Sequence, residues 1–255
     1  MDFKKVAVAF GVLALATTAS AYTQINGTAL QDSLDARTQG GSFLDVHTAQ
    51  HTPSSVWNLD SVGAGNAVMM LEMTAYANNN TLGIYDVNNV GQTLELFGGA
   101  AGTGARALLA LWGNTFTATY FNAQNQFLGQ NSQTFNSLNF GFYLNSGQGN
   151  TFYSQAHLNG DLDNNGEDDS HMVAYQGDSS LMVDANGDGN HGLFTNNNFI
   201  LAWEDLLLSA SDRDYTDMVV MIESFIPVPE PGTLALLGLG LAGLGLARRR
   251  NQNAA

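Results

Sequence analysis

The chain contains no cysteine and few cations. Of its 255 residues, 8 are lysine or arginine and 23 are aspartate or glutamate. Without cysteine, disulfides and cysteine-based metal or catalytic sites are excluded. Because the other cations lie in the two terminal segments, residues 22–226 hold only Arg37, Arg106 and Arg213. Such an acidic stretch repels nucleic acid and anionic membranes, and it needs a cation to approach an acidic polysaccharide.

Several motifs of catalysis are also absent. The sequence has no G-x-S-x-G, no H-E-x-x-H and no G-x-x-x-x-G-K-[ST], which are typical of hydrolases, zinc proteases and nucleotide-binding loops. The glycine-rich stretch 98–105 lacks a lysine and indicates a flexible loop. Of the five histidines, His171 and His191 adjoin acidic loops, where a hydrogen-bonded turn is favoured over zinc ligation. We therefore expect a non-catalytic protein, and keep a glycosidase-like pair of carboxylates as an alternative.

The N-terminal 21 residues have the features of a secretory signal peptide. Lys4 and Lys5 precede an apolar run over 6–16, and Ala19 and Ala21 form a small-x-small cleavage site. A first membrane helix is the alternative, but the apolar run is short for a bilayer. The sequence predicts export and cleavage before residue 22.

The C-terminal end combines a proline motif, an apolar run and an arginine cluster. The uncharged run 233–247 is roughly 22 Å long as a helix, at about 1.5 Å per residue, against a hydrocarbon core of about 30 Å. We predict that it is a transmembrane anchor helix of the inner membrane, followed by a cytoplasmic tail over 251–255. The positive-inside rule would hold three residues in the cytoplasm: Arg248, Arg249 and Arg250.

Residues 227–250 resemble the PEP-CTERM sorting signal of Gram-negative bacteria. The proline motif of that signal is represented by Pro229, Glu230 and Pro231. The resemblance implies processing near this motif by an exosortase-type sorting protease, transient residence in the inner membrane, and delivery to the cell surface or extracellular matrix of a species that makes exopolysaccharide. A C-terminal anchor that is never cut is the alternative.

Residues 22–226 predict an all-β fold, as a single β-sandwich or jelly-roll domain between the signal peptide and the anchor. About ten short apolar runs are separated by Gly, Asn, Asp and Ser. Residues 115–121 alternate as a strand does, and 67–77 and 81–87 read as a hairpin across 78–80. A helix remains open for 28–37 and for 104–112.

Two acidic loops have the first half of a calcium-binding pattern. Oxygen-bearing side chains at alternate positions before a glycine can surround a hard cation, as in an EF-hand. The twelfth positions, Met172 and Thr195, supply no closing carboxylate. Ordinary polar turns are the alternative. The candidate ligands are Asp161, Asp163, Asn165, Glu167 and Asp169 in the first loop and Asp184, Asn186 and Asp188 in the second.

A third acidic group follows a long apolar run, with the candidate ligands Glu204, Asp205, Asp212, Asp214 and Asp217. These acids, with Leu206 and Tyr215, resemble the end of a bacterial extracellular domain of unknown function, and the likeness extends over most of 67–226. It implies a surface module without enzymatic activity. Arg213 as an ion-pair partner and a bound divalent cation are two open ways to relieve the repulsion among the acids.

We therefore expect an exported surface or matrix protein, non-catalytic and stabilised by Ca²⁺, with contact to exopolysaccharide through that ion. A carbohydrate-binding module is the alternative. It would require Trp57, Trp112 or Trp203 to be exposed as a stacking platform.

Overall fold

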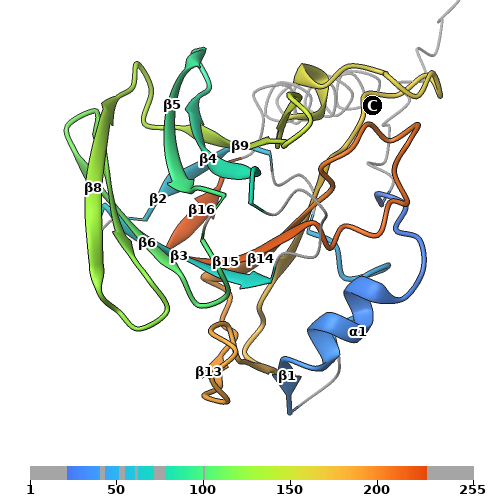
Figure 1. Cartoon of the computed structure of the whole chain (residues 1–255), viewed down its shortest axis with the longest axis horizontal. Coiled ribbons are helices and arrows are strands. Elements are labelled where there is room, and N and C mark those ends of the chain that lie inside the picture. Colours follow the sequence, from blue (N-terminus) through green and yellow to red (C-terminus); the bar gives the residue numbers. More distant parts are fainter. Residues whose placement is uncertain are drawn as a thin grey trace, which may run out of the picture.

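The computed structural model describes residues 22–40, 44–51, 55–60, 63–71, 78–99 and 101–228. Within them, two antiparallel sheets pack face to face, and a third, small sheet and one helix lie against the larger of the two (Figure 1). The all-β sandwich predicted from the sequence is confirmed. The predicted signal peptide and the segment from 229 onward lie outside the described residues.

The larger sheet has seven strands in the order β11-β14-β15-β3-β6-β7-β8. Strand β8 forms one edge of it, at the left of Figure 1. The strands are β3 (Ala64–Leu71), β6 (Arg106–Trp112), β7 (Thr115–Phe121), β8 (Phe127–Thr134), β11 (Met172–Gln176), β14 (Asn198–Trp203) and β15 (Met218–Glu223).

The second sheet has six strands, with β16-β2-β9-β4-β5 in order and β10 also paired with β9. The strands are β2 (Trp57–Leu59), β4 (Thr81–Asp86), β5 (Asn89–Phe97), β9 (Phe140–Asn145), β10 (Thr151–Tyr153) and β16 (Phe225–Pro227). A 3-10 turn, η1 (Ala156–Leu158), follows β10.

The third sheet and the helix make a further layer. The sheet pairs β1 (Thr38–Gln39), β12 (Met182–Val183) and β13 (Gly192–Leu193), and the helix is α1 (Ala29–Asp35). Leu30 and Leu34 are buried one helical turn apart, so α1 is amphipathic. They pack with residues of the larger sheet in a second apolar cluster.

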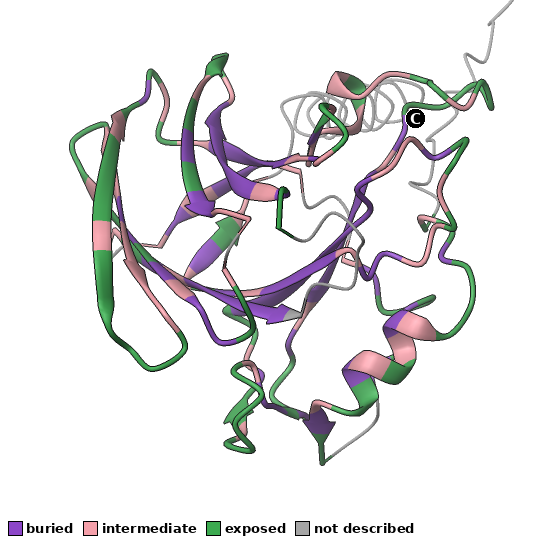
Figure 2. Cartoon of the chain, viewed as in Figure 1, coloured by how far each residue is buried: buried purple, intermediate pink, exposed green. Residues whose placement is uncertain are grey.

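Strand β14 shows why part of the sequence is a continuous apolar run. Phe199 and Leu201 point into the core between the two large sheets, whereas Ile200 and Ala202 point into the second cluster. Because both faces of β14 are covered, every residue of the strand is buried (Figure 2). On the uncovered strand β7, by contrast, only Phe116 and Ala118 are buried, which gives the alternating pattern.

Three predictions on local structure can be checked. Of the two stretches left open as possible helices, 28–37 contains α1, and 104–112 contains strand β6 and not a helix. The predicted hairpin of 67–77 with 81–87 is wrong. Strand β3 pairs with β15 and β6 in one sheet, and β4 pairs with β5 and β9 in the other, so the chain crosses between the sheets. Residues 72–77 lie outside the described residues.

Candidate metal centre

Two connections rich in acids meet at one end of the sandwich, away from β8 (Figure 1). The first, 159–171, leads into β11, and the second, 204–217, joins β14 to β15. The buried phenol of Tyr215 donates a hydrogen bond of 2.6 Å to the Ser170 carbonyl oxygen. The Glu204 amide donates to the His171 carbonyl oxygen at 3.0 Å. The first and third acidic groups of the sequence are therefore neighbours.

The first acidic loop is wound around its own aspartate. The two carboxylate oxygens of Asp161 accept the amides of Asn165 and Gly166, both at 2.9 Å. Asn164 and Gly166 have positive φ angles of 58° and 92°. This tight turn is the local conformation expected from the Asp/Asn/Gly pattern. Glu167 is exposed, and its side chain is not part of the acidic cluster described next.

Asp169 closes a cluster of three carboxyl groups. One oxygen each of Asp161, Asp163 and Asp169 lies within 4.8 Å of the others. Asp169 is only 2% exposed. No hydrogen bond of good geometry reaches its oxygens from the described residues, although the Leu162 amide lies close enough to lower its pKa slightly. Burial, and next the charge of Asp163, raise the pKa of Asp169. A buried carboxylate without a donor is costly unless a cation or a proton compensates it.

Arg213 forms its ion pair with the first loop. Its Nη2 donates to Asp163 Oδ2 at 2.6 Å, and this hydrogen bond lowers the pKa of Asp163. Among the described residues no ion pair joins Arg213 to the acids that flank it in the sequence. The ion pair of Arg213 that the structure shows is thus with the first acidic loop and not with the third acidic group. Arg213 has a left-handed backbone, with φ of 57°.

Glu204 is the centre of the third acidic group. It belongs to two sets of three acids, and in each set one carboxylate oxygen per residue lies within 4.8 Å of the other two. One set adds Asp205 and Asp217, and the other adds Asp212 and Asp214. Glu204 is 1% exposed, and its Oε2 has no hydrogen-bond partner among the described residues. All five acids predicted for this group thus converge.

The pKa values of this group reflect its burial. Burial, and next the charge of Asp217, raise the pKa of Glu204 to about 9. Burial raises the pKa of Asp217 to about 6, against the lowering effect of the Asp205 amide. The carboxylates of Glu204 and Asp217 lie close together, and the charge of Asp217 favours a proton on Glu204. Either this proton or a cation must therefore offset the repulsion in the pair.

Sequence reasoning missed one polar residue of this centre. Asn80 was assigned to a hairpin turn, but it is fully buried and its Nδ2 donates to Asp205 Oδ2 at 2.8 Å. Its Oδ1 accepts the Gly147 amide, also at 2.8 Å. The partners are 125 and 67 residues away in the sequence, so no local signal could indicate them.

The second acidic loop differs from the first. Asp184 accepts three amides, from Gly187, Asp188 and Gly189, at 2.7 to 3.1 Å. Asn186 and Asp188 are exposed, and no cluster of three acids forms here among the described residues. The Arg37 guanidinium donates to the Asp184 carbonyl oxygen at 3.2 Å. The geometry of this loop matches the polar-turn alternative.

His171 lies beside the centre, but it is not a member of any group of possible metal ligands among the described residues. Its ring stacks on Phe152 at a centroid distance of 3.7 Å, and its Nδ1 lies 3.2 Å from the Glu204 carbonyl oxygen. Burial lowers the pKa of His171 to about 4, so the ring is neutral at pH 7. It therefore adds no positive charge to offset the carboxylates.

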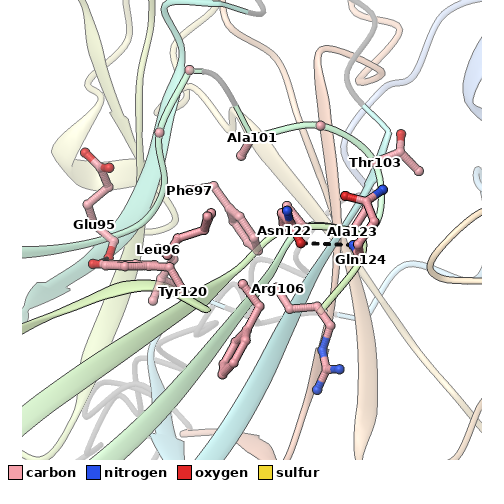
Figure 3. A pocket seen from close by; sticks show the side chains of 16 residues that line it. Glu95, Leu96, Phe97, Ala101, Thr103, Arg106, Tyr120, Asn122, Ala123 and Gln124 are labelled. Carbon is pink, nitrogen blue, oxygen red and sulfur yellow. Dashed lines mark hydrogen bonds between the residues drawn. The ribbon is translucent and has the colours of Figure 1, made fainter. Parts of the chain in front are cut away.

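A pocket of about 570 Å³ lies elsewhere, between the 98–105 loop and the end of the β7–β8 hairpin (Figure 3). Phe97, Tyr120 and Ala101 give it apolar walls, and Asn122 and Gln124 lie at one side. Glu95 is the only carboxylate among its lining residues. This pocket consequently does not hold the pair of carboxylates that glycoside hydrolysis requires.

The structure thus defines an all-β domain with converging buried carboxylates. Residues 227–250 match the family model of the PEP-CTERM protein-sorting motif. No curated protein and no solved structure matches the chain significantly. The chain therefore carries a PEP-CTERM sorting motif, and this supports an exported protein that an exosortase sorts.

Over the described part of the chain, no helix has the length and apolar character needed to cross a bilayer. The predicted anchor 233–247, the processing residues Glu230 and Ala21, and the arginine cluster all lie outside that part.

Proposed function

We propose that residues 22–226 form a non-catalytic surface module that is stabilised by Ca²⁺ after export. The observation that carries this proposal is the pair of buried acids Asp169 and Glu204. Each has carboxylate oxygen without a donor among the described residues, and each faces other carboxylates. Ca²⁺ prefers 6 to 8 oxygen ligands, which an acidic cluster can supply together with backbone carbonyls and water.

Two groups are candidates to hold the ion. The first contains Asp161, Asp163 and Asp169, and the second contains Glu204 with its four acidic neighbours. In the first group Arg213 already neutralises Asp163, whereas in the second Glu204 lies near four other acids. The charge balance therefore favours the group around Glu204 as the stronger site.

We expect calcium to raise the melting temperature of the domain 22–226. Extracellular calcium modules have dissociation constants near 10⁻⁴ to 10⁻³ M. At ten times that constant, an ion that binds only the folded state adds about 1.4 kcal/mol. For a domain of this size the shift is roughly 3 to 6 °C. The measurement is thermal unfolding in EDTA, Mg²⁺ and Ca²⁺ at matched ionic strength.

Two variants sharpen this test. Asp169→Asn should keep the EDTA melting temperature or raise it, because it removes a buried charge, and should lose part of the calcium response. Asp178→Asn is the matched control, since Asp178 is exposed and lies outside the clusters. Equal melting temperatures in EDTA and calcium would refute the proposal.

Sorting provides a separate prediction. If the exosortase cuts near Pro229 and Pro231, then Glu230→Ala should leave a full-length precursor in the membrane fraction. The substitution changes the motif and leaves the apolar run and the arginines intact. Mass spectrometry of the surface, medium and membrane fractions would read both termini. Unchanged size and release of the variant would instead favour an anchor that is never cut.

A further inference from the structure

Trp112 is the most exposed large apolar side chain of the described residues. It is 90% exposed, whereas Trp57 and Trp203 are fully buried. Trp112 is the last residue of β6, and the turn at Gly113, with φ of 60°, leads directly into β7. Leaving an indole in water forfeits the burial of a large apolar surface. An indole held at the corner of a hairpin is thus available to a flat, partly apolar partner.

Polar groups in register extend from Trp112 across three strands. Trp112 pairs with Thr115, and Thr115 pairs with Thr134, in a row across β6, β7 and β8. The next row on the same face contains Thr117 and Ser132. Hydroxyl pairs at 2.8 Å join Thr115 to Thr134 and Thr117 to Ser132. Each bonded pair retains one donor hydrogen and free lone pairs for a ligand.

This outer face differs in charge from the rest of the domain. No aspartate or glutamate occurs between Glu95 and Asp161, although the whole chain has 23 such residues. The one arginine of that stretch, Arg106, begins β6 at the far end of the face, where Phe121 and Phe127 lie in its row. Six residue steps along β6 make the face about 20 Å long. Neutral ligands can therefore approach this face without displacing water from a carboxylate.

We propose that the outer face of β6, β7 and β8 binds an extended polysaccharide, with Trp112 stacked on a sugar ring. Sugar rings present an apolar face edged by hydroxyls, which complements an indole beside rows of threonine and serine. A bilayer would require more apolar or cationic side chains than the two rows provide. The proposal uses no residue of the metal centre, so it stands or falls independently of calcium.

The test uses the full chain in a detergent without a sugar headgroup, with EDTA present. The probes are hydroxyethylcellulose, dextran and alginate, and phosphatidylglycerol vesicles serve as the membrane comparison. Affinity electrophoresis measures binding, and acrylamide quenching of fluorescence reports on Trp112, because the other two tryptophans are buried. We expect at least one polysaccharide to retard the protein and to protect Trp112 from quenching.

Variants decide whether the indole carries the binding. Trp112→Ala should weaken retention about three- to tenfold, and Trp112→Phe should weaken it less. Ile226→Ala is the matched control, since Ile226 is 48% exposed on β16 in the other sheet. Absence of protection by all three polysaccharides, protection by the vesicles alone, or equal retention of Trp112→Ala would each overturn the proposal.

Discussion

Without calcium, the domain should melt at a lower temperature at pH 8.5 than at pH 7.0, and Glu204→Gln should remove most of this difference. An ordinary glutamate has a pKa near 4.5, and burial raises that of Glu204 to about 9. Between these values the folded state holds a proton that the unfolded state has released. The free energy of unfolding therefore falls as the pH rises through this window, by at most about 1.4 kcal/mol per pH unit.

The chosen interval isolates Glu204 from other groups. Asp217, with a pKa of about 6, and His171, with a pKa of about 4, have largely completed their titration below pH 7. A glutamine at 204 keeps the shape and can donate to Asp217 at any pH. Glu223→Gln is the control, because Glu223 is exposed at the end of β15. If the melting temperatures of wild type and Glu204→Gln fell equally between pH 7.0 and 8.5, the prediction would be contradicted.

Calcium should change this pH dependence. A divalent ion bound at Glu204 requires the ionised carboxylate, so it takes the place of the proton on Glu204. With calcium in excess, the melting temperature of the wild type should then vary less between pH 7.0 and 8.5. Calcium should also stabilise the folded domain more at pH 8.5, because Glu204 is protonated in a smaller fraction of the molecules there. If calcium left the pH dependence unchanged, the ion would not bind at the carboxylate of Glu204, and this prediction would be wrong.

The acidic pattern located the candidate metal centre because its local signals are strong. Aspartate and asparagine at alternate positions before Gly166 predict a tight loop, and the loop forms around Asp161 as expected. What the pattern could not supply is the burial of Asp169 or the pairing of Arg213 with Asp163. That pairing crosses 50 residues and depends on how two connections pack.

The strand periodicity predicted the elements better than their pairing. The alternation over 115–121 is a local property and corresponds to β7. Two adjacent apolar segments joined by asparagines look alike whether they form a hairpin or cross between sheets. Residues 78–79 do form a turn, but Asn80 is buried against Asp205 and Gly147, so the segment also makes long-range contacts that a hairpin turn would not make.

The ambiguity over 104–112 has a similar origin. Apolar residues alternate there with small or exposed ones, and alanine and leucine also favour helices. Strand neighbours decide the outcome, because β6 pairs along its length with β7 and also pairs with β3. Leu109 and Ala107 then point into the core, and Trp112 is left at the exposed corner.

Phe142→Ala should destabilise the domain by about 3 to 5 kcal/mol, the largest effect that we expect from a single substitution. The fully buried ring contacts Trp57, Phe140 and Phe225 at centroid distances of 5.8 Å. The ring projects from β9 and contacts side chains of β2 and β16, which are neighbouring strands of the six-stranded sheet, and it belongs to the main core. Its removal leaves a cavity that rigid strands cannot fill.

For a domain of this length the melting temperature should fall by roughly 6 to 20 °C. Because the ring contacts of Phe142 lie within the aromatic core, the decrease should be the same in EDTA and in calcium, as expected for independent sites. Leu138→Ala, at a side chain that is 45% exposed, is the control and should change the free energy of unfolding by at most about 0.5 kcal/mol. A decrease that calcium reverses would mean that the metal centre and the aromatic core form one cooperative unit, contrary to the separation that their contacts indicate.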